Sequence, residues 1–231
     1  MTAPLKMRSY SQTRLTVRYI VSDPSSVGSH LPSAPSEAEL IAASQRGELV
    51  AFNRLVELHQ AAIFNHAARM LGSIPAAEDA AQETFIAAFK NIKAYRGGSF
   101  KGWLFRIATN TCYDQLRQKQ RRPGASLDEY LENPNFQPPS AAAGPEEQAL
   151  SAELARELQR AIATLPEDQR TVLLLSDVEG LSYEEVAEAS GCSLGTVKSR
   201  LSRARGRVRE ELRTKRELLP GWLRLTTESE S

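Results

Sequence analysis

Residues 182–207 decide the fold, and they read SYEEVAEASGCSLGTVKSRLSRARGR. A helix-turn-helix needs a small residue where its two helices touch, a turn glycine about four residues later and an apolar anchor on the second helix. Ala187, Gly191 and Val197 occupy those three places. Three further residues complete the shared apolar face: Val186, Leu194 and Leu201. This stretch therefore predicts a helix-turn-helix.

The second helix of this motif is basic. From Lys198 to Arg209 the chain carries six basic residues and no acidic one, and Ser193 can cap the helix. The donor side chains on the side away from Val197 and Leu201 are Lys198, Ser199, Arg200, Ser202 and Arg203. A recognition helix needs donors there for base edges and phosphates. We interpret the helix as DNA-binding, and the alternative is a basic helix that is merely exposed to solvent.

The composition of the 231 residues is that of an ordinary soluble chain, with 41% hydrophobic residues, 25% charged residues and a net charge of +1. No stretch approaches the ~18 apolar residues that a spanning helix requires, so we expect a cytoplasmic protein without membrane insertion. Cys112, Cys192 and the three histidines show no metal-ligand or disulfide spacing. There is no P-loop and no nucleophile elbow. We expect no metal, no cofactor and no enzymatic activity.

The apolar pattern predicts an all-α fold, with two small helical domains joined by a flexible linker. Residues 1–35 hold seven serines and four prolines, which predicts a disordered extension. Five prolines fall between Pro123 and Pro145 and predict an extended segment. The predicted parts are the extension 1–35, a first domain 36–122, a proline-rich acidic linker 123–147, a second domain 148–215 and a C-terminal tail 216–231.

Helices are placed by periodicity and by their start and stop residues. Ser36 and Glu39 form a capping box at the first start, and Pro75 opens a helix with Glu78 and Asp79 in its first turn. The helix from Pro75 carries five residues toward the core: Ala81, Phe85, Ala88, Phe89 and Ile92. The other predicted helices cover about 49–71, 100–120, 146–164, 167–177, 182–190 and 193–215.

The helix at 100–120 has two distinct faces. One is apolar and predicts the core side: Leu104, Ile107, Ala108, Cys112 and Leu116. The other follows steps of three and four residues: Trp103, Arg106, Asn110, Tyr113 and Arg117. Aromatic rings beside arginine and asparagine suit stacking on unpaired bases along a phosphate backbone. The alternative is that Trp103 is simply a core aromatic.

These motifs occur in a fixed order along the chain. The segment 79–85 (DAAQETF) precedes the loop 95–98 (YRGG), the two-faced helix, the linker and the helix-turn-helix that ends in 195–200 (GTVKSR). The ordered set closely resembles the extracytoplasmic-function (ECF) sigma factors of the sigma-70 family over about residues 38–212. The resemblance implies a non-catalytic subunit of bacterial RNA polymerase that recognises minus-thirty-five and minus-ten promoter elements and promotes DNA melting. It also implies core polymerase, with its β and β′ subunits, and promoter DNA as partners, an anti-sigma factor, and a monomer when unbound.

The resemblance assigns roles to residues by position. The residues implied in core-polymerase binding are Asp79, Gln82, Glu83 and Phe85. The loop 91–99 would capture an unstacked base of the minus-ten element. The residues implied for that element are Asn91, Lys93, Tyr95, Arg96, Ser99, Lys101, Trp103, Arg106, Asn110, Tyr113 and Arg117. Those implied for the minus-thirty-five element are Ser193, Thr196, Lys198, Ser199, Arg200, Ser202, Arg203 and Arg207.

Another hypothesis is a stand-alone helix-turn-helix regulator, which would be a dimer on a palindromic operator. Arg200 stands where many repressors carry an apolar residue, which favours the sigma-like helix. A third hypothesis, a helical adaptor without a DNA role, conflicts with the six unopposed basic residues. Ser202 replaces a residue that is often bulkier in the family, so the promoter preference does not follow from the resemblance.

Overall fold

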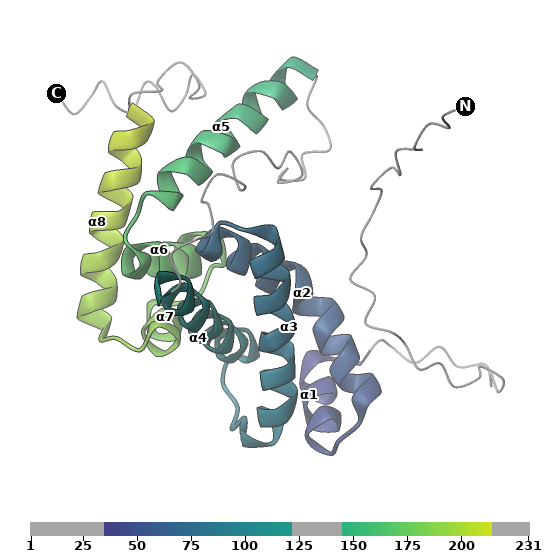
Figure 1. The fold of residues 1–231 in the computed structure, drawn as a ribbon. Helices are drawn as coiled ribbons and strands as arrows, with labels where there is room; N and C mark the ends of the chain where they lie inside the picture. Colours follow the sequence, from purple (N-terminus) through teal and green to yellow (C-terminus); the bar gives the residue numbers. More distant parts are fainter. Residues whose placement is uncertain (1–34, 122–144, 214–231) are drawn as a thin grey trace, which may run out of the picture. The chain divides into compact units, whose positions relative to one another are not determined.

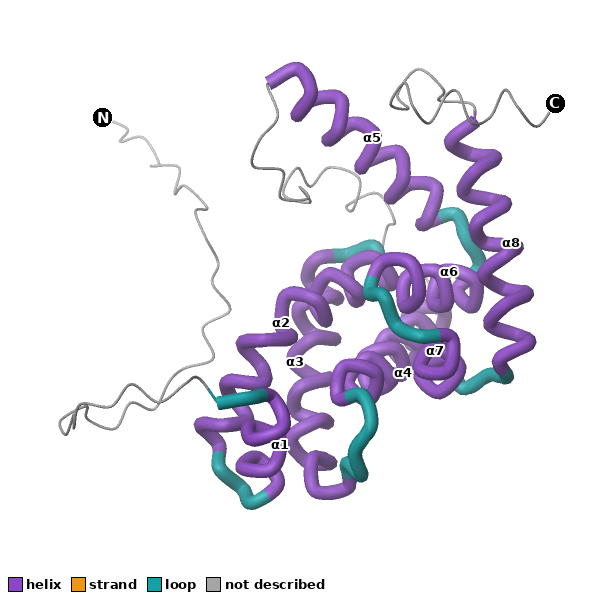
Figure 2. The backbone as a smooth tube through the Cα atoms, turned by 180° about the vertical axis from the view of Figure 1, so that it is seen from behind, coloured by secondary structure: helices purple, strands orange, loops and turns teal. Residues whose placement is uncertain are grey.

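The structure is a computed structural model that describes residues 35–121 and 145–213, with the side chains of 145–152 left out (Figure 1). Its described residues are helical and contain no strand, which confirms the all-α prediction (Figure 2). The first-half helices are α1 (Glu37–Gln45), α2 (Leu49–Leu71), α3 (Ile74–Asn91) and α4 (Phe100–Arg121), with a 3-10 turn at Ile92–Ala94. The second-half helices are α5 (Pro145–Ala163), α6 (Glu167–Leu173), α7 (Tyr183–Ser190) and α8 (Leu194–Arg213), with a π-helical turn at Leu174–Val178.

The predicted helix ends are set by local chemistry. The capping box of Ser36 and Glu39 is formed at the start of α1, and a second one, of Ser182 and Glu185, starts α7. Gly72 ends α2 with a φ of 67° that favours glycine. One detail differs: α3 begins at Ile74, so Glu78 and Asp79 lie beyond its first turn. The predicted extension, most of the linker and the tail lie outside the described residues.

The core of the first half lies between α2, α3 and α4. Its largest fully buried side chains include Leu55, Ile63, Met70, Leu104 and Phe105. The predicted core face of α4 is confirmed: Leu104, Ala108 and Cys112 are buried, and Ile107 and Leu116 pack against them. The prediction that Phe89 points into the core was wrong. Its side chain is 39% exposed, because α3 turns that position toward solvent, although its ring meets that of the buried Phe52 with centroids 5.0 Å apart.

The second half contains the predicted helix-turn-helix in α7 and α8. Val186, Val197 and Leu201 are almost fully buried, and Gly191 makes the turn with a φ of 65°. Leu194 differs from the prediction, since at 36% exposed it sits at the first position of α8, before the helix reaches the core.

The two halves pack against each other in the described part of the chain. α4 contacts α7, and α2 contacts α5 and α6. One continuous cluster of buried side chains therefore includes residues from both halves. The sequence predicts two helical units, but it gives no sign of this contact between them.

Candidate nucleic-acid interface

The start of α8 presents hydroxyl groups. The backbone N–H of Thr196 donates to Ser193 Oγ at 3.2 Å, which confirms Ser193 as the cap of this helix. The two hydroxyl groups of Ser193 and Thr196 also share a hydrogen bond of 2.8 Å. Ser193 is exposed, and Thr196 is partly exposed. Both hydroxyls lie at the positive end of the helix, where phosphate oxygens bind well.

The exposed face of α8 carries most of the predicted base-reading side chains. Lys198, Ser199, Ser202, Arg203 and Arg207 are all exposed. The Arg203 side chain lies along the helix, where its Nε donates to Ser199 O at 3.2 Å and its Nη2 to Ser199 Oγ at 3.3 Å. Ser199 therefore orients the guanidinium of Arg203 before any ligand arrives.

Arg200 points elsewhere. Its Nε lies 2.9 Å from Asp168 Oδ2 of α6, and its side chain is only 26% exposed. Arg205 makes a similar pair through Nε and Nη2, which donate to the carboxylate of Asp177 at 2.8 and 2.6 Å. These pairs fix α8 to the preceding helices. The sequence does not single out Asp168 and Asp177, because nothing in the local pattern shows which distant acid meets an arginine.

The predicted DNA-facing stripe of α4 is exposed only in part. Arg106, Asn110 and Arg117 are exposed. Trp103 is half-buried, with its ring centroid 5.4 Å from that of Tyr95 and 5.5 Å from that of Phe100. Trp103 is therefore a core aromatic in part: its ring packs against Tyr95 and Phe100, and the rest of the side chain stays accessible.

Other residues of the predicted minus-ten surface contact the second half. Tyr113 Oη and Thr171 Oγ1 share a hydrogen bond of 2.7 Å, and burial raises the pKa of Tyr113. Lys101 Nζ donates to the backbone oxygen of Glu179. A hydrogen bond from the Ser99 side chain lowers the pKa of Glu185. The second half therefore covers part of this surface.

The Glu179 side chain is buried where the two halves meet. Its carboxylate is 8% exposed and lies 3.8 Å from the Arg69 guanidinium of α2. Burial raises the pKa of Glu179, and the charges of Arg69 and Lys101 act in the opposite direction. Arg170 of α6 adds a further contact, because its Nη1 donates to Met70 O at 2.8 Å.

The loop between α3 and α4 is folded around its own aromatic ring. Tyr95 is buried, and its hydroxyl donates to Gly98 O at 2.7 Å. Gly97 and Gly98 have φ values of 99° and 89°, which side-chain-bearing residues rarely adopt. Four polar residues of the loop are exposed: Asn91, Lys93, Arg96 and Ser99.

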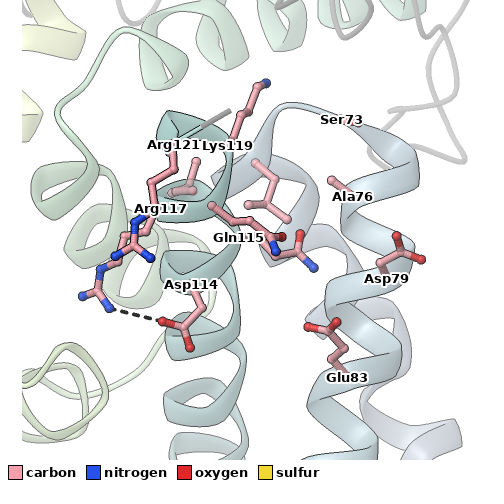
Figure 3. Close-up of a pocket in the computed structure, with 12 residues that line it drawn as sticks. Ser73, Ala76, Asp79, Glu83, Asp114, Gln115, Arg117, Lys119 and Arg121 are labelled. Carbon is pink, nitrogen blue, oxygen red and sulfur yellow. Dashed lines mark hydrogen bonds and ion pairs between the residues drawn. The ribbon is translucent and has the colours of Figure 1, made fainter. Parts of the chain in front are cut away.

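The predicted polymerase-binding segment lies on α3. Asp79, Gln82 and Glu83 are exposed, whereas Phe85 is partly buried and packs against the core. Asp79 and Glu83 line one groove between α3 and the end of α4, where Asp114 and Arg117 form an ion pair at 3.2 Å (Figure 3). Gln82 lies between these two residues in the sequence but does not line the groove.

In the parts of the chain that the structure describes, no three acidic, histidine or cysteine residues are grouped to hold a metal ion. Within the same ranges, every helix is too short or too polar to cross a membrane.

The comparisons with known proteins agree on the class. Residues 55–122 match the family described as Sigma-70 region 2, and residues 155–208 match Sigma-70, region 4. These are the helices that carry the α4 stripe and the α8 face. The chain therefore belongs to the sigma-70 family of transcription initiation factors.

The relatives place it more narrowly. Over 172 residues the chain is 40% identical to the ECF RNA polymerase sigma-E factor of Escherichia coli (strain K12), covering 72% of this chain and 88% of that one. It is 36% identical over 171 residues to the ECF RNA polymerase sigma factor SigE of Mycolicibacterium smegmatis, covering 74% of this chain and 65% of that one. The chain is an ECF RNA polymerase sigma factor.

Two solved structures are similar. One is the sigma factor RpoE of Bartonella quintana in complex with the anti-sigma factor NepR, with 30% identity, a TM-score of 0.57, and coverage of 70% of this chain and 96% of that one. The other is CnrH in complex with the cytosolic domain of CnrY, with 26% identity, a TM-score of 0.53, and coverage of 76% and 96%.

Proposed function

We propose that this sigma factor binds core RNA polymerase, places α8 on a minus-thirty-five element and α4 with its preceding loop on a minus-ten element, and promotes melting there. The observation that carries the proposal is the pair of separate donor-rich faces in the order of the family. One face has Arg106 and Asn110 on α4, and the other has Lys198, Ser199 and Arg203 on α8. The chemistry is binding rather than catalysis.

The α3 surface supports a polymerase contact. Asp79, Gln82 and Glu83 are exposed on a helix whose opposite side is buried through Ala77, Ala80 and other alanines. Small buried residues bring α3 close to its neighbours and leave the acidic side free for a basic partner. We assign Asp79, Gln82 and Glu83 to the core-polymerase contact.

Promoter binding requires the two halves to separate. The two elements lie roughly 25 base pairs apart, and at ~3.4 Å per base pair this is about 85 Å of duplex. Tyr113 and Thr171, one in each half, are in hydrogen-bond contact at 2.7 Å. We propose that polymerase binding holds the halves apart, exposes Lys101 and Tyr113 for DNA and releases Ser99 from Glu185. Tethering then raises the effective concentration of the second DNA contact once the first has formed.

An anti-sigma partner is part of the proposal. The similar RpoE and CnrH structures are complexes with an anti-sigma factor and with the cytosolic domain of CnrY, respectively. We propose that a protein of this kind binds the present chain and keeps its DNA-reading faces covered.

The test is in vitro transcription with core polymerase on genomic DNA, with start sites mapped with and without the chain. We expect start sites that depend on the chain and share two sequence elements upstream. The absence of any dependent start site would reject the proposed function. The double variant Arg106→Ala/Asn110→Ala separates promoter recognition from polymerase binding: it should keep polymerase binding and lose most initiation.

A further inference from the structure

The apolar stripes of α5 and α8 continue beyond the core of the second half. Ile162 of α5 and Ala204 of α8 are almost fully buried, and the two helices contact each other. Residues at steps of four stay on one side of a helix. At such steps from Ile162 and Ala204, four aliphatic side chains extend the stripes, and we call them the α5–α8 apolar face: Leu154, Leu158, Val208 and Leu212.

The described residues cover this apolar face incompletely. Leu158 is 37% exposed, whereas Ile162, one turn farther along α5, is 3% exposed. The other three members of the face are also partly exposed. The exposed fraction rises where α5 and α8 diverge, toward the start of α5 and the end of α8 (Figure 1). Aliphatic side chains that line up in this way on two neighbouring helices form a surface for a further apolar segment.

The chain itself supplies an apolar segment next to this face. α8 ends at Arg213, and residues 214–231 follow it in the sequence. They include the stretch 218–223 (LLPGWL), with three leucines and a tryptophan around a Pro-Gly pair. The five steps from Arg213 to Leu218 span at most about 18 Å of extended chain. Val208 lies only ~8 Å back along the axis of α8, so the stretch can reach the face.

Tethering favours this segment over a separate molecule. A segment joined to its site by a short stretch of chain has an effective concentration on the order of millimolar. A separate apolar helix has to overcome that concentration to bind the same face. The segment of the same chain is therefore the occupant that the observations favour.

We propose that residues 218–223 bind the α5–α8 apolar face within the same chain and stabilise the second half. The inference does not depend on the proposed function, because the face lies away from the DNA-reading side of α8. Arg203 and Val208 are five residues apart, which places them about 140° apart around the helix. A protein that uses the same face must displace the segment, so its apparent affinity falls with the fraction of chains in which the face is covered.

The first test traps the contact with a disulfide in the full chain. Leu158→Cys is paired with a cysteine substitution at each of residues 218, 219, 222 and 223 in turn. Cys192→Ser removes the partly exposed native thiol, and the buried Cys112 stays. We expect mild oxidation to link at least one pair within a single chain, seen as a monomer of changed mobility on a non-reducing gel.

The matched control replaces Leu158→Cys with Glu153→Cys. Glu153 is exposed and lies nearer the start of α5, about 140° around the helix from Leu158. Its distance along the chain from residues 218–223 is nearly the same, so any difference reports the side of α5 on which the segment lies. We expect the Glu153→Cys pairs to form their disulfides on the order of tenfold more slowly.

The second test measures the stabilisation by thermal unfolding. A chain that ends after Arg213 should have a Tm lower by roughly 5 °C than the full chain. Leu158→Ser should lower the Tm of the full chain but have little effect on the shortened one, because its partner there is already absent. Glu153→Ala should change the Tm of neither chain.

Three results would overturn the inference. Equal rates of disulfide formation for Leu158→Cys and Glu153→Cys, or no disulfide with either, would mean that the segment has no site on this face. Disulfides that form only between two chains would assign the face to a second copy. Equal effects of Leu158→Ser in the full and the shortened chain would show that the segment does not contact Leu158. The proposed function has its own test in the mapped start sites, so the two can fail separately.

Discussion

Arg200 and Arg203 lie three residues apart on α8 and have the same charge, but different partners. Arg203 is exposed and oriented by Ser199, whereas Arg200 is paired with Asp168 of α6. A side chain that already holds an ion pair must give it up to read a base. Charge and spacing in the sequence therefore make both residues equal candidates, and only the fold distinguishes the reader from the support.

We predict that Arg203→Ala weakens binding to the upstream element by ~1–3 kcal/mol, the cost of losing a base contact. Arg200→Ala should cost less, and Asp168→Ala should reproduce its effect, because the partly exposed pair contributes only about 0–1 kcal/mol to holding α8. The measurement is binding of the polymerase complex to DNA with an intact or a scrambled upstream element. An Arg203→Ala variant that still discriminates between the two as the wild type does would contradict the assignment.

His66 gives a prediction for stability against pH. It is fully buried between α2 and α4, with Nε2 3.3 Å from Thr109 Oγ1, and burial lowers its pKa to about 3. Below pH ~6.5 His66 is protonated in the unfolded chain but stays neutral in the folded chain. The free energy of unfolding therefore falls by about 1.4 kcal/mol per pH unit as the pH drops toward 3. Above that range the group contributes no pH dependence.

His66→Gln should make this acid-side loss shallower, because glutamine fills similar space and does not titrate. Urea unfolding of both proteins at several values between pH 7 and pH 4 measures the difference. The carboxylates titrate in both proteins and cancel in the comparison. Parallel stability curves for wild type and variant would show that folding does not shift the pKa of His66.

At the scale of single helices, much of the fold could be predicted. The range 49–71 matches α2 at both ends, because its stretch of periodic apolar residues is long and Gly72 ends the helix. The π-helical turn at Leu174–Val178 was not predicted, since its apolar run fits any buried helix. The exposed faces of α4 and α8 follow from period alone, but the Lys101–Glu179 contact joins residues 78 apart and has no local signal.

The two capping boxes allow an element-scale prediction. Ser36→Ala and Ser182→Ala each remove a side chain that accepts from the third backbone N–H of the helix, so each should lower the free energy of unfolding by about 1 kcal/mol. Ser36→Gly and Ser182→Gly should cost only a few tenths of that, since glycine is also a good N-cap. Urea denaturation measures all four. Equal losses for the alanine and glycine variants would argue against the caps.

At the scale of the whole molecule, the contact between the halves covers residues that the proposed function needs for DNA. Lys101 and Tyr113 bind the second half through Glu179 and Thr171, and the buried Glu179 carboxylate has Arg69 as its charged neighbour. Each of these groups would exchange a partner within the chain for DNA or solvent when the halves separate. The free energy of this contact is thus subtracted from that of promoter binding, and weakening it should favour the open form.

Energy transfer between dyes on the two halves can measure this opening. Lys90→Cys on α3 and Glu210→Cys on α8 give exposed sites, and Cys192→Ser removes the accessible native thiol. Cys112 can stay, because it is buried and burial raises the pKa of its thiol to about 12. We expect efficient transfer in the free chain and a large decrease when core polymerase binds.

Tyr113→Phe and Thr171→Val should each lower the transfer in the free chain, since each removes the hydrogen bond between Tyr113 and Thr171, about 1 kcal/mol or roughly a fivefold shift toward the open form. Thr171→Val also removes the contacts of Thr171 Oγ1 with Glu167 O at 2.8 Å and with Met70 Sδ at 3.5 Å. The double variant should open little more than the singles, because both remove the same bond. Thr171→Val is the informative partner in transcription, since Thr171 lies outside the DNA-facing stripe and its loss should leave initiation intact or raise it. Transfer that stays unchanged on polymerase binding would contradict the proposed separation of the halves. The closed form could not reach two promoter elements that lie about 85 Å apart.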